Sequence, residues 1–143
     1  MSFEEEIQQH GGFIFTAVGD SMWPLIRQGR DVLEISRKPA GRLKKYDIPL
    51  YKSKGKYILH RVLQVRESDY VIAGDHNYRK ETGITDEQII GVLTGLTRDG
   101  RRIELSGWKY RLYLFFWCDL FPIRAAVLFI QTVPYRVKRA ILR

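Results

Sequence analysis

Two residues from separate segments of the chain are suited to nucleophilic chemistry, namely Ser21 and His60. Ser21 follows a Gly-Asp turn and precedes Pro24, so we expect its backbone to be held in an exposed corner. A serine becomes a useful nucleophile only when a neighbouring base takes its proton. His60 lies in the apolar stretch Ile58–Val62. Partial burial there would lower the pKa of the ring and keep it in the neutral form that a general base needs.

An acidic side chain follows in a short polar loop. Asp75 belongs to the sequence Gly74-Asp75-His76-Asn77, where it would orient the imidazole or brace the site. His76 is a rival base, but a polar loop offers it less burial than a strand offers His60. Each feature also has a structural interpretation: a strand histidine with satisfied hydrogen bonds, an ordinary Gly-Asp-Ser turn and an Asx-rich loop.

Short segments rich in β-branched and aromatic residues must position these side chains. Two pairs of segments are predicted hairpins, and the sequence around them predicts helices at both ends. The hairpins join 57–65 to 70–73 and 88–96 to 102–105, and the helices are 4–9, closed by Gly11-Gly12, and the segment from Trp108 onward. The pattern predicts a mainly β fold, a small folded sheet or β-barrel in residues 1–107, with a basic, aromatic-rich helical extension in residues 108–143.

The composition is that of a folded globular protein. The chain has 143 residues, of which 45% are hydrophobic and 28% are charged, which suits one domain and excludes disordered and low-complexity classes. The one cysteine, Cys118, excludes an internal disulfide framework and a cysteine-rich zinc site, and we expect it in the core. Three histidines leave little for a multi-histidine centre, so no metal and no cofactor is expected.

The positive charge is concentrated near the C-terminus. Residues 1–107 carry 17 Lys and Arg against 15 Asp and Glu, whereas residues 108–143 carry 7 against 1 together with 9 of the 18 aromatics. Such a segment suits an anionic surface. No nucleic-acid-binding motif is present, so acidic lipid is the expected partner surface. The alternative is a helix that packs on the body and turns its basic face to solvent.

The hydrophobic part of the extension is also the membrane candidate. Residues 112–133 contain two apolar runs, with Asp119 and Arg124 between them, and these charges leave a full span marginal. A helix in the bilayer interface or packed on the body is expected instead. The acidic N-terminus predicts neither a secretory signal nor an N-terminal anchor, so we expect a cytoplasmic or peripherally membrane-associated protein.

The order and spacing of four segments carry a family resemblance. They are Gly19–Ile26 around Ser21, Tyr46-Asp47-Ile48, His60-Arg61-Val62 and Gly74–Asn77. Together these segments resemble the signal peptidase I and LexA-type serine peptidase superfamily (S24/S26-like), over roughly residues 14–105. His60 stands where other branches of this superfamily have a lysine base. In this respect the sequence is similar to the signal peptidases of the endoplasmic reticulum and archaeal branch, in which the base is a histidine.

The resemblance implies a role for each matching residue. Ser21 would be the nucleophile and His60 the general base, with Asp75 as the supporting acid. Glu81 is the nearest candidate for the second acid that some relatives have, with Asp86 a weaker one. The Ser21 N–H would donate into the oxyanion hole. A peptide would bind as an added strand, with the subsite for a small side chain shaped by Met22 and Pro24.

The departures from the family pattern leave the substrate open. Gly19 stands where some relatives have a hydroxyl, and Trp23 is bulky where a charged residue is common. The sequence also does not predict the N-terminal anchor that signal peptidases normally carry. The expected activity is therefore a Ser/His endopeptidase that cleaves a signal- or leader-type peptide after a small residue. The alternative is a non-catalytic, peptide-binding member of the same fold. A LexA-like self-cleaving regulator is disfavoured, because only twenty residues precede Ser21 and the lysine base is missing.

Overall fold

The computed structural model describes residues 2–141, except for the side chains at positions 132, 133, 135, 136 and 138. The last two residues of the predicted extension lie outside this range. The strands are β1 Gly12–Thr16, β2 Asp31–Arg37, β3 Pro49–Ser53, β4 Lys56–Leu59, β5 Arg61–Val65, β6 Tyr70–Ala73, β7 Glu81–Ile84, β8 Ile89–Arg98 and β9 Arg101–Arg102. The helices are α1 Phe3–His10, the 3₁₀ turn η1 Asp86–Gln88, α2 Gly107–Tyr113, the π-helical η2 Leu114–Asp119 and α3 Phe121–Ile141.

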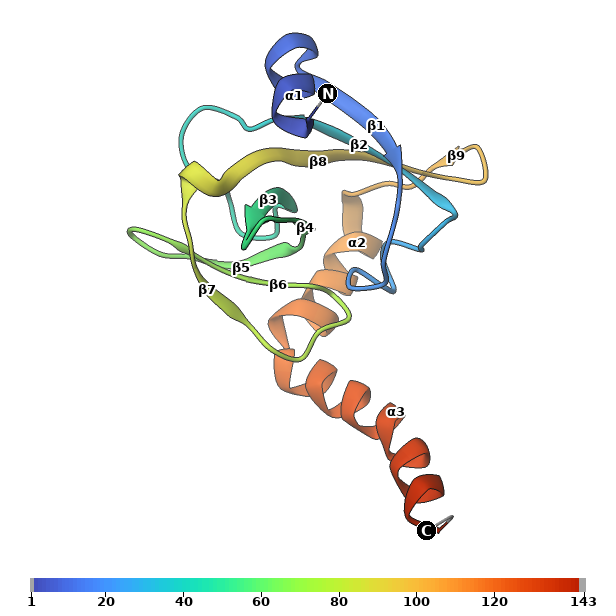
Figure 1. Ribbon diagram of the computed structural model, residues 1–143. Coiled ribbons are helices and arrows are strands. Elements are labelled where there is room, and N and C mark those ends of the chain that lie inside the picture. The colour runs from blue at the N-terminus through green and yellow to red at the C-terminus, as the bar shows by residue number, and fades with distance from the viewer. Residues whose placement is uncertain (1, 142–143) are drawn as a thin grey trace.

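The strands form two antiparallel sheets that wrap around the core (Figure 1). The larger sheet has the order β1-β2-β8-β3-β4, with β9 paired to β8, and the smaller has the order β5-β6-β7. The predicted mainly β fold, small and barrel-like with a helical C-terminal extension, is confirmed. The two predicted hairpins are present as β5–β6 and β8–β9, although β9 is shorter than expected.

The predicted strand through His60 is interrupted at that residue. β4 ends at Leu59 in the larger sheet, and β5 starts at Arg61 in the smaller one. His60 therefore lies at the junction where the chain passes from one sheet to the other. The expectation of a continuous strand was wrong at this point, because neighbouring residues here pair with different strands.

The N-terminal helix is closed at both ends by local interactions. Ser2 and Glu5 form a capping box, in which each side chain accepts a hydrogen bond from the other residue's backbone N–H. Gly11 ends the helix with φ +76°, a left-handed conformation that favours glycine. The predicted short helix is thus confirmed, and its Phe3 ring stacks on Phe13 of β1 at 4.6 Å.

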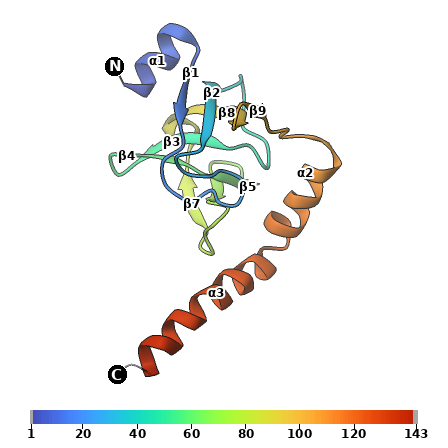
Figure 2. The same cartoon turned by 90° about the vertical axis from the view of Figure 1, so that its right-hand side faces the viewer.

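A buried ion pair connects the C-terminal extension to the barrel. Arg61 and Asp75 are fully buried and form two hydrogen bonds of 2.9 and 3.0 Å. From α2 and η2, the Tyr113 hydroxyl donates to the Asp75 carboxylate at 2.6 Å and the Trp117 indole donates to the Asp75 carbonyl at 2.6 Å. Tyr110 contributes its hydroxyl as an acceptor for Arg61 at 2.7 Å. The first part of the extension therefore packs on the body, whereas α3 extends away from the strands (Figure 2).

Removing one member of this pair should destabilise the fold. In Asp75→Asn the Arg61 guanidinium would remain buried without its counter-charge, so we expect a loss of about 3–5 kcal/mol in the free energy of unfolding, measured by urea denaturation. The control is Asp99→Asn, which breaks the exposed ion pair with Arg30 and should cost much less. Equal losses in the two variants would show that the buried pair does not hold the structure together.

Candidate functional site

The segment that carries Ser21 is a long connection pinned at its base. It joins β1 to β2, and at its start Ala17 donates its N–H to the Asp31 carbonyl at 2.9 Å. The buried Asp31 carboxylate accepts from the Arg27 N–H at 2.7 Å and pairs with Arg98. The connection therefore leaves and re-enters the sheet at one fixed place, and Ser21 is held as a partly buried side chain at its far end.

Gly74 marks the point where three segments meet. A side chain at this position would collide with the Ser21 carbonyl oxygen and would come within 3.1 Å of His60 Cδ2, the ring carbon beside Nε2. The next residues hold the corner in place, since the His76 N–H donates to the Ser21 carbonyl at 2.9 Å. The absence of a side chain at Gly74 thus lets the Ser21 corner, the His60 ring and the 74–77 loop approach one another.

Ser21 and His60 line the same cavity. This cavity has a volume of about 450 Å³ and is mainly apolar, with walls contributed by β1, β2, β3, β4, α1 and the β1–β2 connection. Among the described residues, no hydrogen bond uses the Ser21 hydroxyl or the Ser21 N–H. The unliganded site therefore presents both groups without a protein partner, as is common before a substrate tightens a catalytic pair.

The His60 ring is held by a chain of hydrogen bonds that leads to a carboxylate. Its Nδ1 lies 3.3 Å from the Tyr51 hydroxyl, and that hydroxyl donates to Glu81 Oε1 at 3.0 Å. Because the hydroxyl proton is directed to Glu81, Nδ1 must carry the proton of the bond with Tyr51. The neutral ring then has an unprotonated Nε2, which is the nitrogen that can accept a proton from a serine.

Burial sets the protonation states of this chain. It lowers the pKa of His60 below its ordinary value of 6.5, an effect that the negative charges of Glu81 and Asp75 oppose. Burial, reinforced by the charge of Glu81, raises the pKa of Tyr51, so that its hydroxyl keeps its proton. At neutral pH the ring is therefore uncharged and Tyr51 remains a donor to Glu81.

The two acids predicted for the site have different surroundings. The Asp75 carboxylate is hydrogen bonded to Arg61 and Tyr113 and makes no hydrogen bond with His60 among the described residues, so it does not orient that ring as expected. Asp75 acts on His60 through its charge. Glu81, expected only as a second acid, is the carboxylate connected to His60, through Tyr51.

The other predicted residues lie around the corner at different distances from the cavity. Met22 lines the cavity, is buried, and accepts a weak hydrogen bond on its sulfur from the Asp75 N–H at 3.4 Å. Pro24 is not among the residues that line it. His76 Nδ1 donates to the Asp20 carbonyl oxygen at 3.2 Å, and the His76 ring lies 5.2 Å from that of Trp23. His76 therefore supports the corner from outside the cavity.

Asp86, the weaker candidate for a second acid, is bound elsewhere. Its carboxylate forms an ion pair with Arg42 at 2.9 Å and accepts from the Tyr70 hydroxyl at 2.5 Å. Cys118 is buried, and burial raises the pKa of its thiol to about 12. That group is therefore a protonated thiol at neutral pH, in agreement with a core position.

Two residues of the site were missed in the sequence. Tyr51 connects His60 to Glu81, and Arg61 forms an ion pair with Asp75. An arginine between Leu59 and Val62 was a signal for a buried carboxylate partner, since a buried guanidinium needs one. Nothing in the sequence around Tyr51 indicates the direction of its hydroxyl. Within residues 2–141, no group of three or more His, Cys, Asp or Glu side chains could hold a metal ion.

Comparisons with known proteins do not assign a function to this chain, so a functional assignment depends on the geometry of the Ser21 and His60 site. No protein-family model matches the chain, and no curated protein matches it significantly.

Proposed function

We propose that this protein is a serine endopeptidase in which His60 activates Ser21, a member of the signal peptidase I and LexA-type superfamily that its motifs resemble. The observation that supports this most is the meeting of Ser21 and His60 in one apolar cavity, with His60 Nδ1 bonded to Tyr51. That bond leaves Nε2 as the base. A surface serine and a structural histidine would not need a shared cavity or a fixed tautomer.

The proposed reaction follows the usual course of acyl transfer. Nε2 of His60 takes the Ser21 proton as Oγ attacks the scissile carbonyl carbon, and the Ser21 N–H donates to the oxyanion. The C–N bond then breaks, and His60 gives the proton to the departing amine. This leaves an acyl-Ser21 ester. Water, deprotonated by His60, hydrolyses that ester and restores the serine.

The edges of the larger sheet offer a place for an extended peptide. β1 and β4 are its end strands, and both border the cavity, through Phe15 on one side and Tyr57 to Leu59 on the other. A peptide between them could add to either edge as a further strand. Alternate side chains of such a peptide would face the apolar cavity. A small residue would fit beside Ser21, as the resemblance implies.

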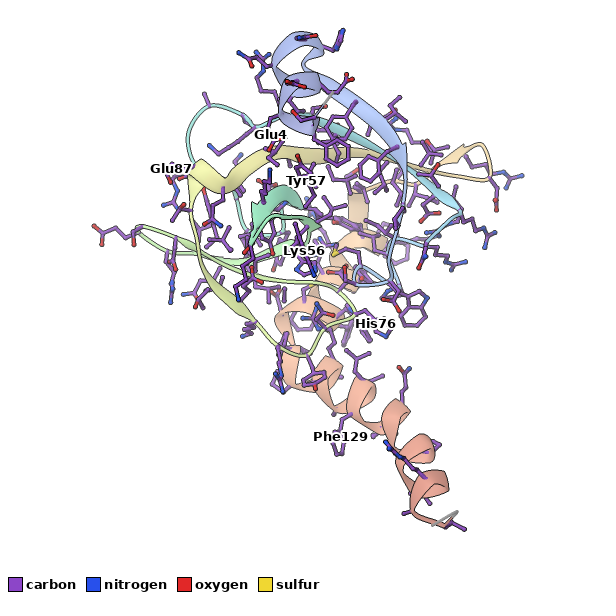
Figure 3. The ribbon with its side chains drawn as sticks, in the orientation of Figure 1. Glu4, Lys56, Tyr57, His76, Glu87 and Phe129 are labelled. Atoms are coloured by element: carbon purple, nitrogen blue, oxygen red, sulfur yellow. The ribbon has the colours of Figure 1, made fainter. Side chains whose placement is uncertain are left out.

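The N-terminal helix closes one end of this cavity. Phe3 contacts Tyr57 of β4 with ring centroids 4.7 Å apart, and the Tyr57 hydroxyl donates to Glu4 at 2.8 Å, where the two labelled side chains lie close together (Figure 3). Since Phe3 also stacks on Phe13 of β1, α1 bridges the two edge strands. A bound peptide would therefore run out of the cavity away from α1.

A non-catalytic, peptide-binding protein is the second candidate. The observation in its favour is that Ser21 Oγ makes no hydrogen bond with His60 in the described structure. Both candidates use the same cavity and the same strand edges. They differ in whether a bound peptide is cut, so an assay of cleavage distinguishes them.

Replacing either member of the pair should abolish cleavage while the fold remains. We expect kcat/KM to fall by about 10⁴-fold or more in Ser21→Ala and in His60→Ala, because each variant lacks one side of the proton transfer. Mass spectrometry of the products from a library of candidate precursor peptides gives the readout. Ser68→Ala and His10→Ala, both at exposed positions, are the matched controls. Cleavage that persists in purified Ser21→Ala protein would refute the peptidase.

The connection through Tyr51 should be visible in the rate. Tyr51→Phe removes the acceptor for Nδ1–H and frees the ring to adopt the wrong tautomer, so kcat should fall at least about tenfold with little change in KM. Tyr78→Phe, at an exposed position in the loop after Gly74, serves as the control. An unchanged kcat in Tyr51→Phe would mean that this hydroxyl does not position the base.

The pH dependence should report the charge of Glu81. Activity requires the neutral ring, so kcat/KM of the wild type should still be high at pH 6.5 and should fall as the pH drops through the lowered pKa of His60. Glu81→Gln removes a charge that raises this pKa, so its acidic limb should lie at lower pH. Glu67→Gln, at an exposed position, should leave the limb in place. A limb that moves to higher pH in Glu81→Gln would contradict the assignment.

A further inference from the structure

The C-terminal helices expose apolar side chains on the side that does not face the barrel. We call these side chains the outer apolar face; they are Leu112, Phe115, Phe116, Ile123, Ile130 and Val137. Each of them is between 47% and 64% exposed. Leu112, Phe115 and Phe116 have the spacing of one helical face, and Ile123, Ile130 and Val137 recur every seven residues along α3. Within the described residues, the exposed large hydrophobics are thus concentrated in this segment.

The opposite side of α2 and η2 packs on the body of the protein. Tyr113 and Trp117 bind Asp75, while Asp119 accepts from the Tyr46 hydroxyl and pairs with Lys45 at 2.8 Å. On α3, Arg124 and Leu128 are buried. The inner face of α2 and η2 is therefore fixed on the body, so their part of the outer apolar face is not simply a consequence of loose attachment. On α3, the guanidinium nitrogens of the buried Arg124 have no hydrogen-bond partner among the described residues.

The charge around the outer apolar face favours an anionic partner. Residues 108–143 carry seven Lys and Arg, of which Arg124 is buried, against the one acidic residue Asp119, which is already paired with Lys45. Lys109, Arg111 and Arg139 are exposed. Two copies of so basic a segment would repel each other. This repulsion disfavours a dimer in which the apolar residues that recur every seven positions along α3 pack against those of a second copy. Apolar side chains beside excess positive charge are the combination that binds the surface of acidic bilayers.

The geometry favours a position on the bilayer over a path through it. No single helix of the described chain is long and apolar enough to span a membrane. The helices Gly107–Asp119 and Phe121–Gln131 are long and apolar enough only when they are taken together, and they are bent by 75° relative to each other. Insertion of this pair would also break the contacts of Asp119 with Lys45 and Tyr46. We propose that the outer apolar face inserts into the headgroup region of an anionic lipid bilayer while the inner face stays on the body.

This arrangement would orient the cavity relative to the lipid. Asp75, which holds Tyr113 and Trp117, is followed by His76, whose N–H holds the Ser21 carbonyl. One short loop thus contacts both the lipid-binding helices and the Ser21 corner. The proposal concerns location only, so it does not depend on whether Ser21 cuts peptides.

Vesicle co-sedimentation with the full chain tests the proposal. We expect binding to vesicles of phosphatidylcholine with about 30% phosphatidylglycerol, weaker binding to phosphatidylcholine alone, and a decrease with added salt. The double variant Phe116→Asp/Ile130→Asp should bind about tenfold or more weakly. The control Val65→Asp/Tyr78→Asp changes the net charge equally at exposed positions on the barrel and should bind almost like the wild type.

Several results would overturn the proposal. One is equal binding by the two double variants, and another is no binding by the wild type. A third is a wild-type dimer in light scattering that becomes monomeric in Phe116→Asp/Ile130→Asp, because the outer apolar face would then be a contact between copies. Circular dichroism should show that both double variants are folded.

Discussion

A buried imidazole can serve as a base only if its two nitrogens have different and fixed roles. In this protein the hydrogen bond between His60 Nδ1 and Tyr51 imposes that difference, because the Tyr51 proton is already directed to Glu81. The position of His60 between β4 and β5 then brings the ring to the cavity that contains Ser21. The proposed chemistry depends on this one contact, since the other tautomer would present a proton donor to the serine.

The two carboxylates near the site divide two tasks. Asp75 is fully buried with Arg61 and anchors the C-terminal helices through Tyr113, so its main contribution is structural. Glu81 is connected to His60 through Tyr51 and contributes to the orientation of the ring. Their charges both raise the pKa of His60 against the effect of burial. The site therefore balances an apolar environment, which keeps the base neutral, against two charges that stabilise its protonated form during the reaction.

Much of the fold could be predicted from the sequence because local rules dominate there. The Gly11 end of α1 and the hairpins β5–β6 and β8–β9 follow from capping and turn residues. The break at His60 could not be predicted, since it arises from strand pairing with two different sheets. The break between the C-terminal helices lies at Leu120, just before Pro122, where a proline favours the end of a helix, but its angle of 75° could not be predicted.

The candidate site was predicted in its residues more than in its connections. Ser21 and His60 have the residue types that nucleophilic chemistry needs, and both line the cavity. The Gly74–Asn77 loop favours Asp75 over Glu81 as the acid. A buried Arg61 implies a carboxylate partner, but the sequence does not show that this partner is Asp75. The role of Tyr51 could not be predicted for a related reason. The sequence of a strand predicts which face of the sheet a tyrosine occupies, but not which group its hydroxyl contacts.

The protonation pattern of the His60 ring tests most directly whether His60 is the general base for Ser21. Long-range ¹H–¹⁵N correlation spectra of protein labelled with ¹⁵N-histidine, with His60→Gln used to assign the signal, distinguish the two tautomers. At neutral pH we expect a neutral ring with the proton on Nδ1 and a titration midpoint below 6.5. A ring that carries its proton on Nε2, or that titrates above 6.5, would contradict a general base poised to deprotonate Ser21.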